Sequence, residues 1–247
     1  MCSLAIFPLP CSTMQLRIIS IGALSSNPLW GEKPGATVRT GHATTTLIQS
    51  GKKNILVDPG LPAQILAQRL GERINLRPVD ITHVFLTSFR PDVWRGITAF
   101  ETATWWISEK EREGMGVPLV RRMQQAAEDG DEQLKTALQN DIAVLKRCVV
   151  APDRLADGVD IFPLPGVTPG MCGVLVAGPI DTMGNGTALI TGDAVPTLDH
   201  LQRATVPHGA ADVDAAMESF KEAVEIADFI VPGRDNWVVN PIRRGFA

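Results

Sequence analysis

Histidine and cysteine are scarce in this chain, with four of each among 247 residues. The cysteines form no Cys-x-x-Cys pair and no regular spacing, so nothing indicates a disulfide framework. A reducing cytoplasm is therefore the simpler expectation for the protein's location.

Long apolar runs are also lacking, since none approaches the ~20 residues needed to cross a bilayer. Residues 4–10 are apolar, but no Lys or Arg precedes them and two prolines interrupt them, which is unlike a signal peptide. The formal net charge of −4 gives no reason to expect nucleic acid or an anionic membrane as a partner.

What is present is an ordinary globular composition, with 45% hydrophobic and 20% charged residues. The length suits one large domain, and a clean strand pattern begins at Met14. We expect a single domain over residues 14–247. Residues 1–13 are interpreted either as a disordered N-terminal extension or as sequence that precedes a true start at Met14.

The hydrophobic pattern alternates short β-branched stretches with longer stretches of helical period. Strands are expected at residues 16–21, 44–48, 54–57, 81–87, 102–107, 160–164, 173–177, 188–191 and 229–231. Helices are expected at 62–70, in two pieces of 110–149 separated at 129–131, and after the cap Asp212, with Val213, Met217, Phe220 and Val224 facing inward. A turn is expected at 184–186. Periodicity alone fits two packed sheets with outer helices, and also a doubly wound sheet.

Five short motifs follow one another at the ends of these strands. They are Asp58-Pro59-Gly60, residues 87–93, residues 165–171, Thr191-Gly192-Asp193 and Pro232-Gly233-Arg234-Asp235. In this order they resemble the motifs of the metallo-β-lactamase superfamily of hydrolases. The resemblance implies an α/β fold, a four-layered αβ/βα sandwich, with the site at one edge between two sheets.

The departures from the family pattern all fall on metal ligands. Histidines that would bind two metal ions in the family are replaced here by Ser88, Arg90, Val93, Met171 and Arg234. The family's two carboxylate ligands remain as Asp92 and as Asp193, which would bridge the ions. Two carboxylates and a serine do not supply the three or four ligands that zinc requires. The resemblance therefore implies a scaffold without metal ions, and no cofactor is expected.

The replacements themselves suggest an exchange of charge. Asp92 and Asp193 would lie together in a partly buried cleft, where unpaired carboxylates are costly. The guanidinium groups of Arg90 and Arg234 could neutralise both carboxylates and bind them bidentately. The alternative is that both arginines point to solvent while the aspartates cap nearby backbone.

Other residues are weaker candidates for the site. Asp58 and Asp235 are expected to line the pocket or to support it. Trp30, Trp94 and Trp237 either line the pocket mouth or pack in the core, and Cys172 is either a thiol in the cleft or a small core residue. His200 and His208 follow Asp193 and could complete a site for one divalent metal ion with Asp92 and Asp193. Ser88 has no histidine base placed for it, which argues against a serine hydrolase.

Residues 110–149 are expected to form a helical insertion, because lactonase-like branches of the family insert helices at this point. It covers the cleft, makes a homodimer contact or packs as outer layer. Two functions stay open. The degenerate site binds a small anionic or polar ligand, or serves a regulatory or interaction role. Alternatively the protein hydrolyses an ester, lactone, thioester or phosphoester through a rebuilt metal site or without metal.

Overall fold

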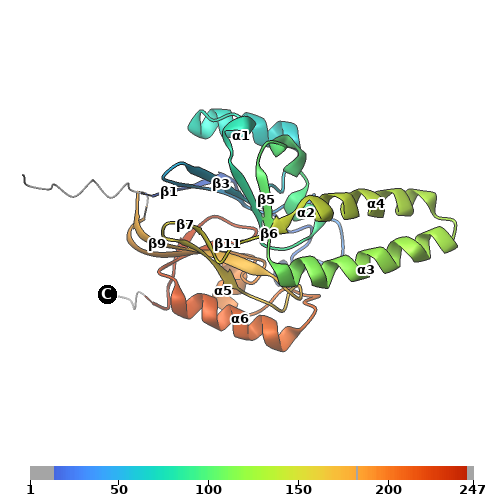
Figure 1. The fold of residues 1–247 in the computed structure, drawn as a ribbon. Coiled ribbons are helices and arrows are strands. Elements are labelled where there is room, and N and C mark those ends of the chain that lie inside the picture. Colours follow the sequence, from blue (N-terminus) through green and yellow to red (C-terminus); the bar gives the residue numbers. More distant parts are fainter. Residues whose placement is uncertain (1–13, 182, 244–247) are drawn as a thin grey trace, which may run out of the picture.

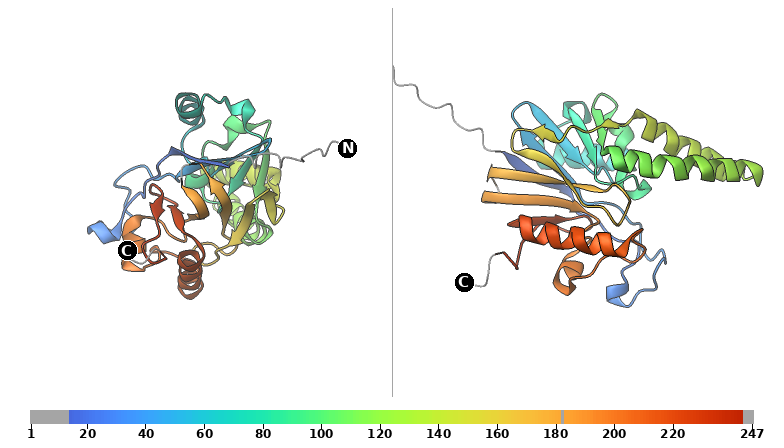
Figure 2. Two further views of the ribbon diagram at one scale, coloured as in Figure 1. Left: turned by 90° about the vertical axis from the view of Figure 1, so that its left-hand side faces the viewer. Right: turned by 60° about the horizontal axis from the view of Figure 1, so that its bottom comes forward.

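Two six-stranded sheets face one another in the computed structural model, which describes residues 14–181 and 183–243 (Figures 1 and 2). The first sheet has the order β1-β2-β3-β4-β5-β6. Its strands are β1 Gln15–Ser20, β2 Thr45–Ser50, β3 Lys53–Val57, β4 His83–Leu86, β5 Thr104–Ile107 and β6 Val149–Val150. The first three are antiparallel, whereas β3 to β6 run parallel.

The second sheet has the order β12-β11-β10-β9-β8-β7. Its strands are β7 Arg154–Ala156, β8 Val159–Pro163, β9 Cys172–Ile180, β10 Gly184–Gly192, β11 Phe229–Pro232 and β12 Val238–Val239. Only β10 and β11 pair in parallel. The expectation for residues 1–13 lies outside the described residues.

Helices cover the outer faces of both sheets, so the molecule has the expected four layers (Figure 1). The helices are α1 Ala63–Ile74, α2 Pro91–Trp94, α3 Glu109–Glu128, α4 Glu132–Arg147, α5 Leu198–Arg203 and α6 Val213–Ile226, with short 3-10 turns η1 Pro28–Trp30, η2 Pro78–Asp80 and η3 Ile97–Phe100. One apolar cluster, which includes Ile55, Phe85 and Val174, fills the space between the sheets. Two further clusters seal the outer faces against the helices. No helix among the described residues is long and apolar enough to cross a membrane.

The expected insertion is a helical hairpin that projects beyond the sheets (Figures 1 and 2). The break between α3 and α4 falls at residues 129–131, as the sequence predicts, and the Asp131 side chain accepts a hydrogen bond from Leu134 N. Leu138 and Leu145 of α4 are buried, but Leu134 near the tip is 38% exposed. The helical period therefore identified α4, and the helix is covered less at its tip than at its base.

Two local expectations were wrong. Residues 184–186 are not a turn but the start of β10, where Gly184 pairs with Ile180 and Gly186 with Gly178. Val213 does not face inward: it is the first residue of α6 and is 57% exposed, although Asp212 caps the helix as expected.

Candidate functional site

Four strand ends carry four of the five motifs to one edge of the sandwich, and the remaining motif, residues 165–171, joins β8 to β9. Asp58 follows β3 and residues 87–93 follow β4, which pair in parallel. Asp193 follows β10 and Arg234 follows β11, the parallel pair of the second sheet. Parallel neighbours present their carboxyl ends at the same edge of a sheet, and for this reason residues far apart in sequence meet here.

Arg90, Asp92, Asp193 and Arg234 form one network of ion pairs, called the charge cluster below. Arg234 donates from Nε to Asp193 Oδ1 (2.8 Å) and from Nη2 to Asp193 Oδ2 (2.7 Å), a bidentate pair. Its Nη1 donates to Asp92 Oδ2 (2.6 Å). Arg234 thus joins the two carboxylates that the sequence predicted would meet, and its side chain is only 1% exposed.

Arg90 completes the cluster from the solvent side. Its Nη1 donates to Asp193 Oδ2 (2.9 Å), and its Nε lies 3.7 Å from Asp92 Oδ1. The Arg90 side chain is 39% exposed, against 4% for Asp193. Among the described residues, Arg90 Nη2 has no hydrogen-bond partner. The alternative in which both arginines point away into solvent is therefore wrong.

The charge pairing controls the ionisation of its buried members. Burial alone would raise the pKa of Asp193, but Arg234 and then Arg90 hold that pKa well below its usual range. Burial likewise opposes the charge on Arg234, while Asp193 and Asp92 raise its pKa above the ordinary value. Both groups remain charged at neutral pH, so Asp193 is unsuited to accept a proton.

A glycine makes the closest approach in the cluster possible. A Cβ on Gly233 would lie 2.5 Å from the Gly192 carbonyl group and 2.7 Å from Asp193 Oδ1. No larger residue fits between the loops after β10 and β11. The glycine before Arg234 therefore has a steric reason in the structure itself.

A cleft of about 240 Å³ opens at the charge cluster. Arg90 and Asp193 line it together with residues from two segments, 24–35 and 200–208, which include His200 and His208. Six of the lining residues belong to the loop between β1 and β2, residues 23–42, called the strap below. Sequence reasoning did not identify the strap as part of the site.

The strap is fixed at its base and near its tip. At the base, Ala23 N donates to His42 O (2.9 Å) and His42 N donates to Ala23 O (3.0 Å). Near the tip, Trp30 Nε1 donates to Asp199 Oδ2 (2.6 Å) on α5. The cleft is therefore bounded by a loop that contacts both the sheet edge and the helix carrying His200.

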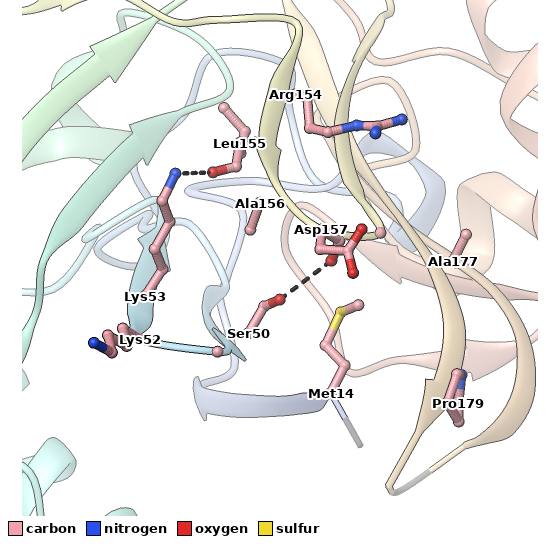
Figure 3. A pocket seen from close by; sticks show the side chains of 12 residues that line it. Met14, Ser50, Lys52, Lys53, Arg154, Leu155, Ala156, Asp157, Ala177 and Pro179 are labelled. Carbon is pink, nitrogen blue, oxygen red and sulfur yellow. Dashed lines mark hydrogen bonds between the residues drawn. The ribbon is translucent and has the colours of Figure 1, made fainter. Parts of the chain in front are cut away.

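A larger hollow, of about 740 Å³, lies at the opposite end of β3 (Figure 3). Its lining includes Met14, Lys53 and Asp157, and Ser50 Oγ donates there to Asp157 O (3.1 Å). None of the predicted site residues lines it. We therefore place the candidate site at the charge cluster, where the motifs meet.

Comparison with known families agrees with this geometry. The model of the metallo-beta-lactamase superfamily matches residues 38–233. The chain belongs to this superfamily. None of the curated proteins matches the chain.

Solved structures of the superfamily share the fold. A candidate metallo-beta-lactamase from Thermotoga maritima is 20% identical with a TM-score of 0.63, covering 92% of this chain and 99% of that one. A quorum-quenching N-acyl homoserine lactone hydrolase is 17% identical with a TM-score of 0.61, covering 89% and 88%. A dizinc quorum-quenching lactonase is 19% identical with a TM-score of 0.57, covering 86% and 80%. At these identities the likeness concerns the fold.

Of the seven positions that bind metal ions in the family, only Arg90 and Asp193 line the cleft. Ser88, Val93 and Met171 also lie outside the charge cluster. Val93 and Met171 are buried in separate apolar clusters, on either side of the sandwich. Ser88 is 1% exposed, and its Oγ has no hydrogen-bond partner among the described residues. Ser88 therefore lacks the base that a nucleophilic serine needs.

The three tryptophans also lie outside the cleft lining. Trp30 is 57% exposed and bonds to Asp199, Trp94 stacks on Phe89, and Trp237 packs edge-on against Phe229. Trp94 and Trp237 therefore pack beside the motifs, whereas Trp30 holds the strap to α5.

The remaining candidates support the loops. Asp58 is buried with φ 54° and accepts from Thr87 N (2.8 Å) and Thr87 Oγ1 (2.7 Å), while Asp235 accepts from Leu198 N. Burial raises the pKa of Asp58 to about 7, against the effect of the Thr87 hydrogen bonds. Cys172 packs in the core between the sheets, and burial raises its pKa, so it is not a reactive thiolate.

Glu111 is a supporting residue that the sequence did not reveal. It lies in the first turn of α3 and is fully buried. Its carboxylate accepts from Phe89 N (2.7 Å), Thr168 Oγ1 (2.8 Å) and Gly170 N (3.1 Å), joining the second and third motifs. An acidic residue at a helix start is ordinary, so nothing in the pattern marked it.

The side chains at the family's metal positions do not fit metal ions. The carboxylates of Asp92 and Asp193 already accept hydrogen bonds from guanidinium groups, and the Arg234 guanidinium lies against both of them. Within the described part of the chain, no group of three His, Cys, Asp or Glu residues is placed to hold a metal. His200 and His208 do share the cleft with Asp193, but Asp92 is not among its lining residues. Guanidinium groups thus take up the hydrogen-bonding oxygens that a metal ion would need.

Proposed function

We propose that this superfamily member carries arginine side chains in place of metal ions, and that its cleft binds a small organic anion. The role is ligand-dependent regulation or interaction rather than metal-dependent hydrolysis. The observation that carries the proposal is Arg234, whose buried guanidinium donates to both Asp92 and Asp193. Because a cationic group lies where those carboxylates converge, a dication would have to displace it against strong repulsion.

Arg90 supports the choice of an anion. The four charged groups of the cluster sum to zero, so attraction does not come from excess positive charge. It comes instead from donors: Arg90 lines the cleft, is partly exposed and has Nη2 without a partner among the described residues. A guanidinium with open donors favours a carboxylate or phosphate group.

Hydrolysis of an ester, lactone, thioester or phosphoester is the alternative. It is supported by the fold that the chain shares with lactone hydrolases. A shared fold does not fix chemistry, and no nucleophile with an adjacent base is found at the cluster among the described residues. Metal content separates the two functions.

The first measurement is elemental analysis of untagged protein purified without chelators. We expect less than one equivalent of zinc, iron or manganese per chain. One or more tightly held equivalents, lost on Asp92→Ala, would favour the hydrolase with a rebuilt site.

The second measurement is the melting temperature in phosphate, sulfate and butyrate. Each anion that binds the folded state raises it by mass action. We expect the rise to be lost in Arg90→Gln and retained in the control Arg69→Gln, which changes an exposed pair on α1. No rise with any anion, or an equal rise in Arg90→Gln, contradicts the proposed site.

A further inference from the structure

His200 is a buried polar side chain of the cleft with one nitrogen unused by the protein. The residue is 3% exposed and lines the cleft together with Arg90 and Asp193. Its Nδ1 lies 2.8 Å from Thr197 Oγ1. Within the described residues, its Nε2 has no hydrogen-bond partner. A ring nitrogen without a protein partner, on a residue that lines a cleft, is free to bond to a ligand or to water.

The Thr197 hydroxyl is the hydrogen-bond partner of His200 Nδ1, and the tautomer argued below has this hydroxyl as donor. Thr197 is the N-cap of α5, and its Oγ1 accepts a hydrogen bond from His200 N (3.4 Å). A hydroxyl has one proton to donate, and the acceptor near it is His200 Nδ1. With Nδ1 accepting, the ring proton lies on Nε2. His200 therefore offers an N–H donor to the cleft.

The surroundings of the ring disfavour its charged form. Burial lowers the pKa of His200, while Asp199 and Asp193 oppose the shift only in part. No carboxylate lies within ion-pairing distance of the ring among the described residues. The cleft thus combines one cationic donor, Arg90, with one neutral donor, His200.

We propose that His200 Nε2 donates a hydrogen bond to a second oxygen of the bound anion, so the cleft selects organic acids that also carry a hydroxyl or carbonyl oxygen. Arg90 binds the anionic group, and His200 donates a hydrogen bond to the neutral oxygen. Leu24, Pro28 and Pro207 give the lining apolar surface for a short carbon chain. This inference rests on the proposed anion site and adds the chemical class of its ligand.

The volume agrees with a small acid. A cleft of about 240 Å³ holds on the order of eight waters at ~30 Å³ each, which suits a carbon chain of a few atoms. Within such a chain, the position of the second oxygen decides whether it reaches His200. A series of acids that have the same chain length but carry the hydroxyl at different positions therefore tests the inference directly.

The experiment measures binding of butyrate and of 2-, 3- and 4-hydroxybutyrate by calorimetry to the full chain. At least one hydroxybutyrate should bind about five-fold or more tightly than butyrate, the effect of one neutral hydrogen bond. His200→Leu should bind that hydroxybutyrate and butyrate equally. His200→Gln, which keeps a donor near the position of Nε2, should retain part of the preference.

Two further variants keep the test decisive. Thr197→Val removes the hydroxyl that fixes the tautomer and should reduce the preference even if His200→Leu fails to fold. Arg69→Gln, the control on α1 away from the cleft, should retain it. Equal binding of all four acids by the wild type, or a preference that survives in His200→Leu, overturns the role of His200 but leaves the anion site intact. If none of the four acids binds, the anion site itself is wrong.

Discussion

Arg234 shows how a single side chain can replace a metal ligand without replacing its chemistry. A histidine at this position would share a metal ion, whereas the guanidinium provides the positive charge itself and spreads it over three nitrogens, each bonded to a carboxylate oxygen. Arg234 therefore contributes to the stability of the fold, and this contribution depends on both aspartates. Removing one partner of a buried pair leaves an orphaned charge, and this is the expensive outcome.

Changing Arg234→Met should lower the free energy of unfolding by roughly 3–5 kcal/mol, because Asp193 is left buried and partly unpaired. The double change Arg234→Met with Asp193→Asn should cost less than the sum of the single changes, since the orphaned charge is then gone. Urea unfolding of the four proteins measures the cycle. Additive costs within about 0.5 kcal/mol would show that the two side chains do not interact.

Asp58 predicts a pH dependence of the opposite sign to that of the charge cluster. Its pKa of about 7 in the folded protein exceeds the unfolded value of about 3.9. Its contribution to stability is therefore complete below pH ~4 and is lost as the pH rises through about 7. Asp193, whose pKa is lowered, instead loses its contribution as the pH falls below ~4.

Asp58→Asn isolates this effect. Asparagine tolerates the positive φ, can accept from Thr87 N and can donate to the Thr87 hydroxyl, so the two contacts persist. Between pH 4.5 and pH 7.5 the wild type should lose stability relative to Asp58→Asn, as measured by urea unfolding. Subtracting the two curves cancels the histidines, and parallel curves would mean that Asp58 is ionised throughout this range.

At the scale of elements, the sequence predicted the strands and helices whose buried residues form a regular apolar pattern. The strands with continuous apolar patterns were found, because both faces of these strands are covered. Leu56, Phe85 and Ile190, for example, are all buried. The short strands β6, β7 and β12 were missed. Val149 and Val150 are exposed, so β6 exists only through pairing with β5, which no local pattern encodes.

The same limit applies to the site. The charge cluster could be predicted, because strand-end motifs place their residues at a shared edge whatever the loops do. The strap and Glu111 could not. Their roles depend on contacts such as Trp30 with Asp199, and Glu111 with Gly170, between segments distant in sequence. His200 was recognised as able to reach the cleft, but its link to Thr197 is visible only in the structure.

At the scale of the whole molecule, the order of the motifs carries more information than any one of them. Each motif alone is a short turn with proline or glycine. Their order along the chain matches the order in which β3, β4, β9, β10 and β11 reach one edge of the sandwich. This order therefore specified two packed sheets rather than a single doubly wound sheet. This order does not depend on which residues occupy the five positions where the family has histidines, because apolar strands and glycine turns determine it.

The projecting hairpin of α3 and α4 underlies the last prediction, a homodimer. Two helices packed mainly on each other leave apolar side chains uncovered: Val117 is 56% and Val120 is 40% exposed on α3, with Leu134 on α4. Packing two hairpins together would cover them in a four-helix arrangement. Sedimentation should show a dimer at tens of micromolar that Val117→Glu with Val120→Glu dissociates. Val79→Glu, at the equally exposed site in η2, is the control. A monomer at all concentrations, or a dimer insensitive to both α3 changes, would assign the hairpin to the outer layer of a single molecule.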